Sequence, residues 1–273
     1  MEAPTSTTAE NRDCFKRTTA IDSNTGIMDE RVLLLVFTQL NFDPHVLSVA
    51  ARVSRRLRAV VSRVLWRHAC ISRAPRLVSA LTAGFPSGAN RVCGGWHALA
   101  KLLFYCAGCE PSSRFPLPHR VPGHFVGVSR FSKTSGRSFL SRQFWGDLLY
   151  VSDPCEHAVE GRPNGEDLGA YRGVFCSFVR SLTRAFLVRR RVDLEMRIRC
   201  PYCGTRVWNM TAARLVPRSA SRRLGAHHGR LEYFVCVNGH LYGNCWLEHL
   251  SSSEEVEEEE EEEEEEEYES GSM

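Results

Sequence analysis

Two short segments near the C-terminal end of the chain carry residues whose types and spacing are typical of a metal site. Residues 200–204 read Cys-Pro-Tyr-Cys-Gly, and residues 236–240 read Cys-Val-Asn-Gly-His. Thiolate sulfur and imidazole nitrogen are ligands that structural zinc prefers, and a glycine lets the backbone turn so that its N–H groups face the sulfur atoms. We therefore predict a zinc ion whose ligands are Cys200, Cys203, Cys236 and His240.

The predicted zinc is structural, because four protein ligands leave no coordination position open for a substrate. Cys245 is the alternative fourth ligand if His240 points away from the other three. Each cysteine segment follows a candidate strand: apolar residues alternate over residues 192–198, and residues 233–235 are also typical of a strand. Two turns at the ends of strands predict a zinc-ribbon-like unit over about residues 192–247.

A second Cys-x2-Cys pair lies at Cys106 and Cys109. No second turn of matching sequence accompanies it, and no thioredoxin-like βαβ pattern surrounds it. The sequence therefore favours core cysteines at a helix end over a second zinc site or a redox pair. The possible partners for a second metal are His119, His124, Cys155 and His157.

Asp153, Cys155 and His157 combine the residue types of a cysteine hydrolase. In such enzymes the nucleophile, the base and the carboxylate normally come from distant segments. Here they lie within five residues of one another beside Pro154, which favours a loop. No glycine-rich phosphate-binding loop of either common pattern occurs in the sequence. We therefore predict that the protein is not an enzyme.

The charge of the chain is divided unevenly. Of 35 basic and 32 acidic residues, 14 acidic ones lie between Glu254 and Glu269, which leaves a net charge of +17 on the rest. Basic clusters at residues 189–191 and 222–223 could serve nuclear import or contact phosphate. We expect a nuclear protein, with the cytoplasm as a further location.

The alternative class of function is a zinc-ribbon regulatory protein that binds nucleic acid. The basic body of the chain favours it. However, the arginines are spread along the whole chain, and no strip of aromatic and basic residues accompanies the metal segments. Nucleic acid is therefore the less favoured partner.

We expect neither a membrane span nor a secretory signal. The longest strongly apolar run, residues 32–37, is far shorter than the roughly 18 residues that a span needs. The eleven cysteines are then expected in a reducing compartment, where metal binding or burial is favoured over disulfides. Residues 1–26 and the acidic residues 251–273 show no apolar periodicity and are predicted to be disordered.

Residues 27–73 predict a compact set of short helices. Asp29 is a candidate N-cap, and apolar residues recur at helical spacing over residues 33–40. Residues 43–64 predict a second helix, which starts at Asp-Pro with proline at the first helical position. A unit of this size is marginal by itself. Its surplus of apolar residues indicates that a partner covers part of it.

This helical segment resembles the F-box, whose consensus places Ile-Phe four residues after Ile-Leu, followed by a Val-Cys-Lys/Arg-x-Trp helix and a late Trp. The chain has Val-Leu at 32–33, Val-Phe at 36–37, Val-Ser-Arg-Arg-Leu at 53–57 and Leu-Trp at 65–66. It departs from the consensus at three places. Residues 27–28 are Ile-Met where the F-box has Leu-Pro, Ser54 stands where the consensus helix has Cys, and Leu57 stands where that helix has Trp. The resemblance implies apolar residues that divide between the helical core and the groove of a Skp-type adaptor: Val32, Leu33, Val36, Phe37, Leu40, Val53 and Leu57.

Further strings resemble a more specific family. Residues 102–106, 130–136, 152–157 and 171–175, together with the two metal segments, resemble the plant F-box family named for the empfindlicher im dunkelroten Licht (far-red hypersensitive) protein. The resemblance covers roughly residues 27–250. It implies a substrate receptor of a Skp–cullin–F-box ubiquitin ligase, which reaches a cullin through the Skp-type adaptor and presents an unknown target protein. The resemblance also implies a role in signalling, since the founding member of the family is linked to phytochrome A light signalling and its relatives to abscisic acid responses and flowering.

The expected fold is α+β, with N-terminal all-α F-box helices, a mixed α+β domain that contains the zinc-ribbon-like unit, and disordered termini. Within the mixed domain, residues 96–103 and 175–186 show helical spacing, and residues 148–151 are typical of a strand. The predicted divisions are a disordered arm (1–26), the F-box (27–73), a substrate-recognition domain (74–250) and a disordered acidic tail (251–273).

Overall fold

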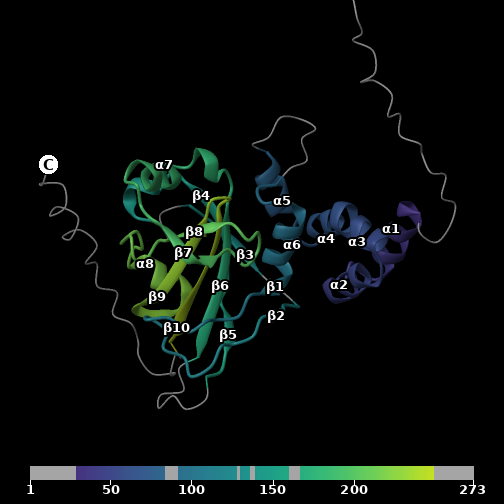
Figure 1. The fold of residues 1–273 in the computed structure, drawn as a ribbon. Coiled ribbons are helices and arrows are strands. Elements are labelled where there is room, and N and C mark those ends of the chain that lie inside the picture. The colour runs from purple at the N-terminus through teal and green to yellow at the C-terminus, as the bar shows by residue number, and fades with distance from the viewer. Residues whose placement is uncertain (1–28, 84–91, 128–129, 136–138, 160–166, 249–273) are drawn as a thin grey trace, which may run out of the picture.

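The computed structural model describes residues 29–83, 92–127, 130–135, 139–159 and 167–248. The architecture is α+β as expected, with helices at the N-terminal end and a sheet in the rest (Figure 1). Both segments predicted to be disordered, residues 1–26 and 251–273, lie outside the described part. Within the described part, no helix has the length and apolar character that crossing a membrane requires.

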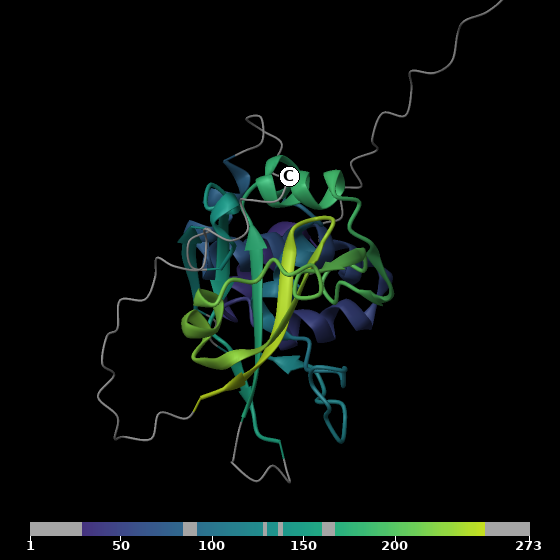
Figure 2. The same ribbon diagram turned by 90° about the vertical axis from the view of Figure 1, so that its left-hand side faces the viewer.

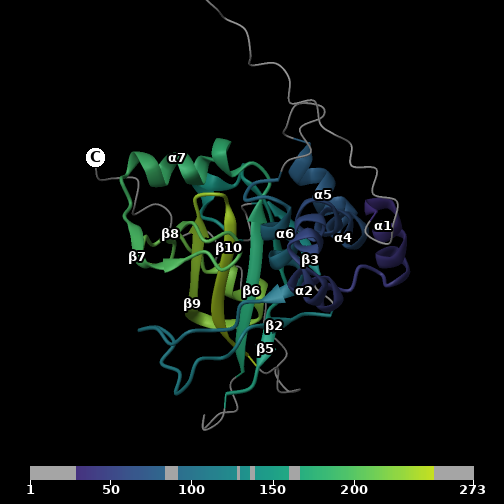
Figure 3. The ribbon, with the colours of Figure 1, turned by 45° about the vertical axis from the view of Figure 1, so that its right-hand side comes forward.

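Six helices and one π-helical turn form the described N-terminal part. They are α1 (Glu30–Gln39), α2 (Pro44–Val53), α3 (Arg55–Val60), the π-helical turn η1 (Val61–Leu65), α4 (Trp66–Arg73), α5 (Pro75–Thr82) and α6 (Trp96–Phe104). α1 and α2 lie farthest from the sheet, whereas α5 and α6 lie beside it (Figures 1 and 3). α4 packs against α6, so α6 joins the outer helices to the sheet.

Side chains at the helix starts explain where the first helices begin. The carboxylates of Asp29 and Asp43 accept hydrogen bonds of 2.7 and 2.9 Å from main-chain N–H groups of α1 and α2, as N-caps do. The predicted single helix over residues 43–64 is wrong. Ser54 is extended, with φ of −152°, and its hydroxyl caps α3 instead. The apolar spacing continues across this break, so spacing alone does not reveal it.

Eight of the described strands form one sheet, and two more form a separate ribbon, β1 (Tyr105–Cys106) with β2 (His124–Phe125). The sheet runs in the order β3-β4-β6-β10-β9-β8-β7, and β5 also pairs with β6. Every pairing is antiparallel. The strands are β3 (Phe131–Ser135), β4 (Leu148–Ser152), β5 (Cys155–His157), β6 (Leu168–Phe175), β7 (Leu194–Arg199), β8 (Arg206–Asn209), β9 (Ala226–Cys236) and β10 (His240–Leu247).

The two faces of the sheet belong to two different cores. Side chains alternate along a strand, so the neighbours Phe234 and Tyr233 of β9 point to opposite sides. Phe234 joins the core that includes the N-terminal helices, and Tyr233 joins the core that includes α7 (Leu182–Arg189) and α8 (Ser219–Leu224). Figure 2 shows the N-terminal helices behind the sheet. The central strand β6 is buried along its whole length.

The helical spacing at residues 175–186 predicted a helix that starts earlier in the chain than the one in the structure. Phe175 ends β6, a 3₁₀ turn spans Phe178–Arg180, and α7 begins only at Leu182. The hydroxyl of Ser181 caps α7 by accepting a hydrogen bond from a main-chain N–H of its first turn. The aromatic residues before this cap pack in the core from the strand and the turn rather than from a helix.

The predicted zinc-ribbon-like unit over residues 192–247 is not a separate unit. Its strands β7 to β10 continue the large sheet, because β10 pairs along its length with β6. The expected half-buried strand is an edge strand instead: Met196 of β7 is 83% exposed. The alternation of apolar residues predicted the strand correctly, but at Met196 the core covers neither face of the strand.

Candidate functional site

The two cysteine segments form tight turns at the ends of strands. The first turn joins β7 to β8, and the second joins β9 to β10. Gly204 and Gly239 have φ of +74° and +83°, a region that glycine adopts without steric strain. In the second turn the main-chain N–H of His240 points at Sγ of Cys236, 3.3 Å away. The glycine turns predicted from the sequence are confirmed.

The structure brings the four predicted zinc ligands together. The knuckle cluster, defined as Cys200, Cys203, Cys236 and His240, has all its ligand atoms within 4.8 Å of one another. Nδ1 of His240 lies 3.8, 3.5 and 3.4 Å from the sulfur atoms of Cys200, Cys236 and Cys203. The sulfur atoms of Cys203 and Cys236 are 3.7 Å apart. Zn–S bonds of about 2.3 Å and Zn–N bonds of about 2.0 Å give tetrahedral edges of roughly 3.5 Å for N–S and 3.8 Å for S–S, so the cluster fits zinc.

The knuckle cluster is closed on the side of α6. Gly94, in the turn before α6, has φ of +76°, and a Cβ added there would lie 2.5 Å from Cε1 of His240. The ring of Tyr202 packs edge-on to His240 at 6.0 Å. His240 is fully buried, and its Nε2 atom has no hydrogen-bond partner in the described residues. Burial and four protein donors suit a structural metal rather than a catalytic one.

The electrostatics of the knuckle cluster favour thiolate at Cys203, whereas contacts with Cys203 and Cys236, together with burial, raise the pKa of Cys200. Burial lowers the pKa of His240, but its contacts with Cys203 and Cys236 outweigh burial and raise that pKa to about 9. Contacts with Cys200 and Cys236 lower the pKa of Cys203. The side-chain amide of Asn238 adds a hydrogen bond of 3.5 Å to the Cys203 sulfur. The deprotonated thiol is the form that binds metal.

Cys245, the alternative fourth ligand, lies on the other face of the sheet. It is five residues from His240 on β10, and such residues face opposite sides of a strand. Its thiol packs in the core with α7 and α8, where a Cβ added to Gly169 would lie 2.9 Å from its sulfur. Burial raises the pKa of Cys245 to about 12. The geometry therefore favours His240 as the fourth donor.

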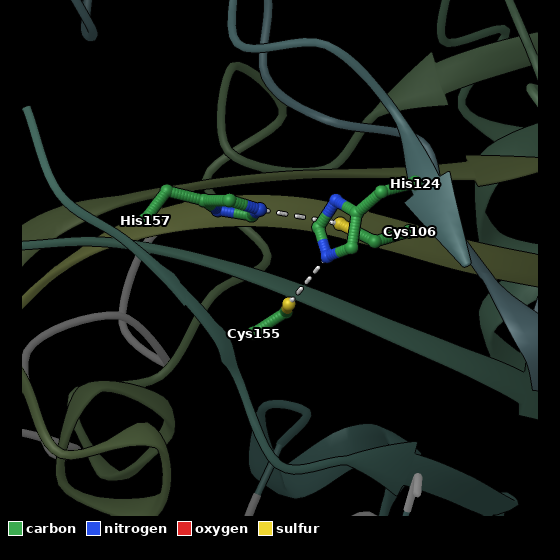
Figure 4. A group of neighbouring side chains, drawn as sticks. All are labelled: Cys106, His124, Cys155 and His157. Atoms are coloured by element: carbon green, nitrogen blue, oxygen red, sulfur yellow. Dashed lines mark hydrogen bonds between the residues drawn. The ribbon is translucent and has the colours of Figure 1, made fainter. Parts of the chain in front are cut away.

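A second group of possible metal ligands lies outside the knuckle cluster (Figure 4). The strand cluster, defined as Cys106, His124, Cys155 and His157, also has all its ligand atoms within 4.8 Å of one another. The sequence named these residues only as possible partners and favoured core cysteines. Cys109 does lie in a small core, whereas Cys106, although buried, also contacts His157.

The other residues named near the second Cys-x2-Cys pair lie apart from the strand cluster. His119 is exposed, and Asp153 makes a salt bridge of 3.9 Å with Arg223. The expected loop around Cys155 and His157 is wrong, because both belong to β5, which pairs with β6. A Cys-x-His spacing on a strand places both side chains on one face, and this was the signal in the sequence that could have revealed the cluster.

α1 and α2 carry large apolar side chains on their exposed surfaces. On α1 and its C-cap residue they occur at relative positions 0, 3, 4 and 8, and on α2 at 0, 3 and 7, so each helix has one apolar stripe. The exposed apolar set, by which we mean these seven side chains, consists of Val32, Leu35, Val36, Leu40, Val46, Val49 and Val53.

The residues assigned to adaptor binding from the sequence divide between surface and core. Leu33 and Phe37 are only 8% and 5% exposed, and Leu57 is half-buried against the same core. The exposed ones are Val32, Val36, Leu40 and Val53. The sequence did not single out Leu35 or Val49, because their neighbours share their apolar character and burial was not yet known.

Comparison with known proteins identifies relatives along most of the chain. The family described as "EID1-like F-box protein 2 C-terminal domain" matches residues 112–246. EID1-like F-box protein 3 of Arabidopsis thaliana is 58% identical over 230 residues, which cover 84% of this chain and 83% of that protein. EID1-like F-box protein 2 of the same plant is 43% identical over 84% of this chain and 90% of its own length. EID1-like F-box protein 1 is 41% identical over 89% of this chain and 81% of its own length.

No solved structure matches the chain at a significant level. Short N-terminal helices with exposed apolar stripes, followed by a sheet-rich part with clustered cysteines and histidines, agree with an F-box protein. The chain belongs to the EID1-like F-box protein family, because relatives at 41–58% identity span more than four-fifths of it. The family resemblance stated from the sequence is confirmed.

Proposed function

We propose that this protein is the substrate receptor of a Skp–cullin–F-box ubiquitin ligase. In this proposal the helices within residues 27–73 bind a Skp-type adaptor, and through it a cullin, while residues 74–250 bind a target protein. Membership of the EID1-like F-box family supports the proposal. The observation that carries it is the exposed apolar set of α1 and α2.

The exposed apolar set is costly to leave in water. Leu35 and Val53 are 69% and 71% exposed, although each would gain about 1.5–3 kcal/mol from full burial. Exposed apolar stripes of this kind mark interaction sites on soluble proteins. A groove of a Skp-type adaptor that accepts the two stripes would bury them. The buried residues Leu33 and Phe37 then hold the helices in the shape that presents the stripes.

The proposed receptor performs no bond chemistry. It binds the ligase through one part and the target through another, so the reaction between a target lysine and a ubiquitin thioester becomes effectively intramolecular. The reaction is faster because the effective concentration of the target lysine is higher. This requires that the adaptor-binding and target-binding parts keep a fixed position relative to each other. The packing of α4 on α6, and of α6 beside the sheet, supports such a relation.

The metal of the knuckle cluster is zinc in this proposal. Three thiols and one imidazole are a donor set that structural zinc prefers. Zinc there would hold the β7–β8 and β9–β10 turns together, and with them the side of the sheet that faces α6. Its role is to stabilise the target-binding part of the receptor.

The target is proposed to belong to plant light or hormone signalling, as the family resemblance implies. A nuclear location is supported by the exposed arginines at residues 189–191, at the end of α7. The second basic cluster, residues 222–223, ends α8. Fusion of a fluorescent protein to the chain, with and without substitution of residues 189–191 by Gln, tests this part through the nuclear share of fluorescence.

Adaptor capture tests the proposal directly. The full chain is co-expressed with a Skp-type adaptor, and Leu35→Glu and Val53→Glu are compared with the wild type. Each variant should weaken capture by about tenfold or more, since a buried charge replaces apolar contact worth more than about 1.4 kcal/mol. Val179→Glu is the matched control, because Val179 is also apolar and 63% exposed but lies on the 3₁₀ turn before α7.

Undiminished capture by Leu35→Glu and Val53→Glu would contradict the proposed adaptor surface. Titration of the same proteins with duplex DNA at several salt concentrations addresses the rival function. Tight binding that falls steeply with salt, together with no capture of the adaptor by the wild type, would favour a nucleic-acid-binding protein.

A further inference from the structure

The strand cluster gathers two thiols and two imidazoles from three strands (Figure 4). Cys106 lies on β1, His124 on β2, and Cys155 and His157 on β5. We propose that these four side chains hold a second zinc ion, in a Cys2His2 site distinct from the knuckle cluster. This inference does not depend on adaptor binding, and it extends the proposed function to the architecture of the receptor.

The pairing and alternation of the strands direct the four side chains toward one another. Cys106 and His124 are direct partners in the antiparallel ribbon β1–β2, so their side chains project from the same side. Cys155 and His157 are two residues apart on β5, so they share one face of that strand. Each pair supplies one sulfur and one nitrogen, and the two pairs face each other.

Two glycines keep the ribbon narrow at the cluster. A Cβ added to Gly123, the residue before His124, would collide with the hydroxyl of Tyr105 and lie 2.8 Å from the carbonyl oxygen of Cys106. Gly108 has φ of +74°, and a Cβ there would collide with the carbonyl oxygen of Val121. The close approach of β1 and β2, and therefore the Cys106–His124 pair, requires glycine at both positions.

The distances in the strand cluster match a zinc tetrahedron. Nε2 of His157 lies 3.7 Å from Sγ of Cys106, and Nε2 of His124 lies 3.4 Å from Sγ of Cys155. A tetrahedral zinc with one sulfur and one nitrogen ligand separates them by roughly 3.5 Å. The two imidazole rings meet edge-on, at 82° and 5.2 Å, rather than stacked. The short Nε2–Sγ distances show that each ring turns a nitrogen toward one of the sulfur atoms.

Hydrogen bonds alone do not explain why two thiols and two imidazoles face one another. A thiol is a weak donor and a weak acceptor, so two imidazoles gain little from facing two thiols. Zinc binding would release the thiol protons and give both sulfur atoms and both nitrogen atoms a strong partner. Two thiolates and two imidazoles in a tetrahedron select zinc among common divalent metals.

The second zinc would fasten a weakly structured segment to the sheet. β1 and β2 have two residues each, and a ribbon of that length is not stable by itself. Through β5, which pairs with the central strand β6, the zinc ties this ribbon to the main sheet. Phe125, next to His124, also packs edge-on against His45 of α2 at 5.9 Å. The site therefore lies beside a ribbon that contacts α2, one of the proposed adaptor-binding helices.

The two metal sites differ in their access to solvent. In the strand cluster His124 is exposed, and Cys155 and His157 are half-buried, whereas three of the four knuckle residues are buried. A chelator or a competing proton reaches the strand cluster more easily. Zinc should therefore leave the strand cluster first.

Zinc content of the full chain, purified under reducing conditions and measured by elemental mass spectrometry, tests the proposal. The wild type should hold two zinc ions per chain, and His124→Ala and Cys155→Ser should each hold one. His124 is exposed, so its replacement leaves the core intact. His119→Ala is the matched control, because His119 is an exposed histidine of the same connection between β1 and β2, outside the cluster, and this variant should keep two.

X-ray absorption identifies which site remains. The zinc that remains in Cys200→Ser should have two sulfur and two nitrogen ligands, whereas the zinc that remains in His124→Ala should have three sulfur ligands and one nitrogen ligand. One zinc per wild-type chain that His124→Ala and Cys155→Ser leave unchanged would overturn the proposal. A disulfide between Cys106 and Cys155 in protein purified under reducing conditions would overturn it as well.

Discussion

Arg172, a residue of the sheet, caps the C-terminal end of α6: its Nη1 atom donates a hydrogen bond of 3.0 Å to the carbonyl oxygen of Leu102. The same atom lies 3.0 Å from the carbonyl oxygen of Tyr105. Arg172 belongs to the central strand β6 and is only 3% exposed. The last carbonyl groups of a helix lack partners within the helix, and a cation there also favours the helix dipole. This side chain therefore links the helical part to the sheet.

Arg172→Gln should destabilise the protein strongly. A shorter neutral side chain leaves the buried carbonyl of Leu102 and the half-buried carbonyl of Tyr105 without the guanidinium, and the loss at a buried group costs about 1–3 kcal/mol. Denaturant unfolding followed by circular dichroism measures the free energy of unfolding. Arg197→Gln on the edge strand β7 is the control, because Arg197 is exposed. Equal stability of the two variants would show that Arg172 does not support α6.

Leu33→Ala combined with Phe37→Ala should unfold the outer helices. Both side chains are buried, and each truncation of this kind typically costs about 2–5 kcal/mol. Adaptor capture should fall together with stability. Leu35→Ala on the same helix should change stability by no more than about 0.5 kcal/mol, since Leu35 is mostly exposed. A double variant with unchanged stability and full capture would refute the role of Leu33 and Phe37 in holding the outer helices together.

The sequence predicted the knuckle cluster because its determinants are local. A Cys-x2-Cys-Gly turn and a Cys-x3-His turn each specify their own geometry, and adjacent strands β8 and β9 bring the turns together. The strand cluster has only the Cys-x-His spacing of β5 as a local signal. It depends on a β1–β2 register and on a β5–β6 pairing between residues far apart in the chain. Likewise, burial separates Leu33 from Leu35, which have the same type and differ only in the helix face.

Gly94→Ala should lower the zinc content of the knuckle cluster. The added Cβ would collide with the His240 ring, so the ring must move away from the sulfur atoms. Gly95→Ala is a close control: Gly95 also has positive φ, +85°, but an added Cβ meets nothing within 4 Å. Both variants carry backbone strain, and only Gly94→Ala should lose metal. Equal zinc content in the two variants would show that Gly94 does not position His240.

Glu232→Gln should make the stability of the protein less dependent on pH. Burial is the main cause that raises the pKa of Glu232, whereas a hydrogen bond from Ser112 lowers it. Because the folded-state pKa of this acid exceeds the unfolded one, the folded state holds its proton more firmly. Stability is then lost as pH rises from the unfolded pKa of about 4.5 through the folded pKa. Gln should remove that loss.

Urea unfolding of the wild type and of Glu232→Gln between pH 4 and pH 7 measures this effect. The variant should gain stability relative to the wild type as pH rises, because it keeps an acceptor for Ser112 without a buried charge. A relative loss of stability with rising pH would mean that the charged form of Glu232 is favoured in the folded protein.

His240→Ala and Cys245→Ala separate a metal ligand from a core thiol on the same strand. His240 lies in the knuckle cluster, and Cys245 lies in the core on the opposite face. His240→Ala removes a donor, so zinc affinity at this site should fall by more than the 10–100-fold typical of supporting residues around a metal. Cys245→Ala leaves a cavity and should lower the melting temperature while zinc content stays at the wild-type level. Adaptor capture should survive in both, since the exposed apolar set is remote in sequence from β10. Zinc loss from Cys245→Ala with retention in His240→Ala would reassign the fourth ligand.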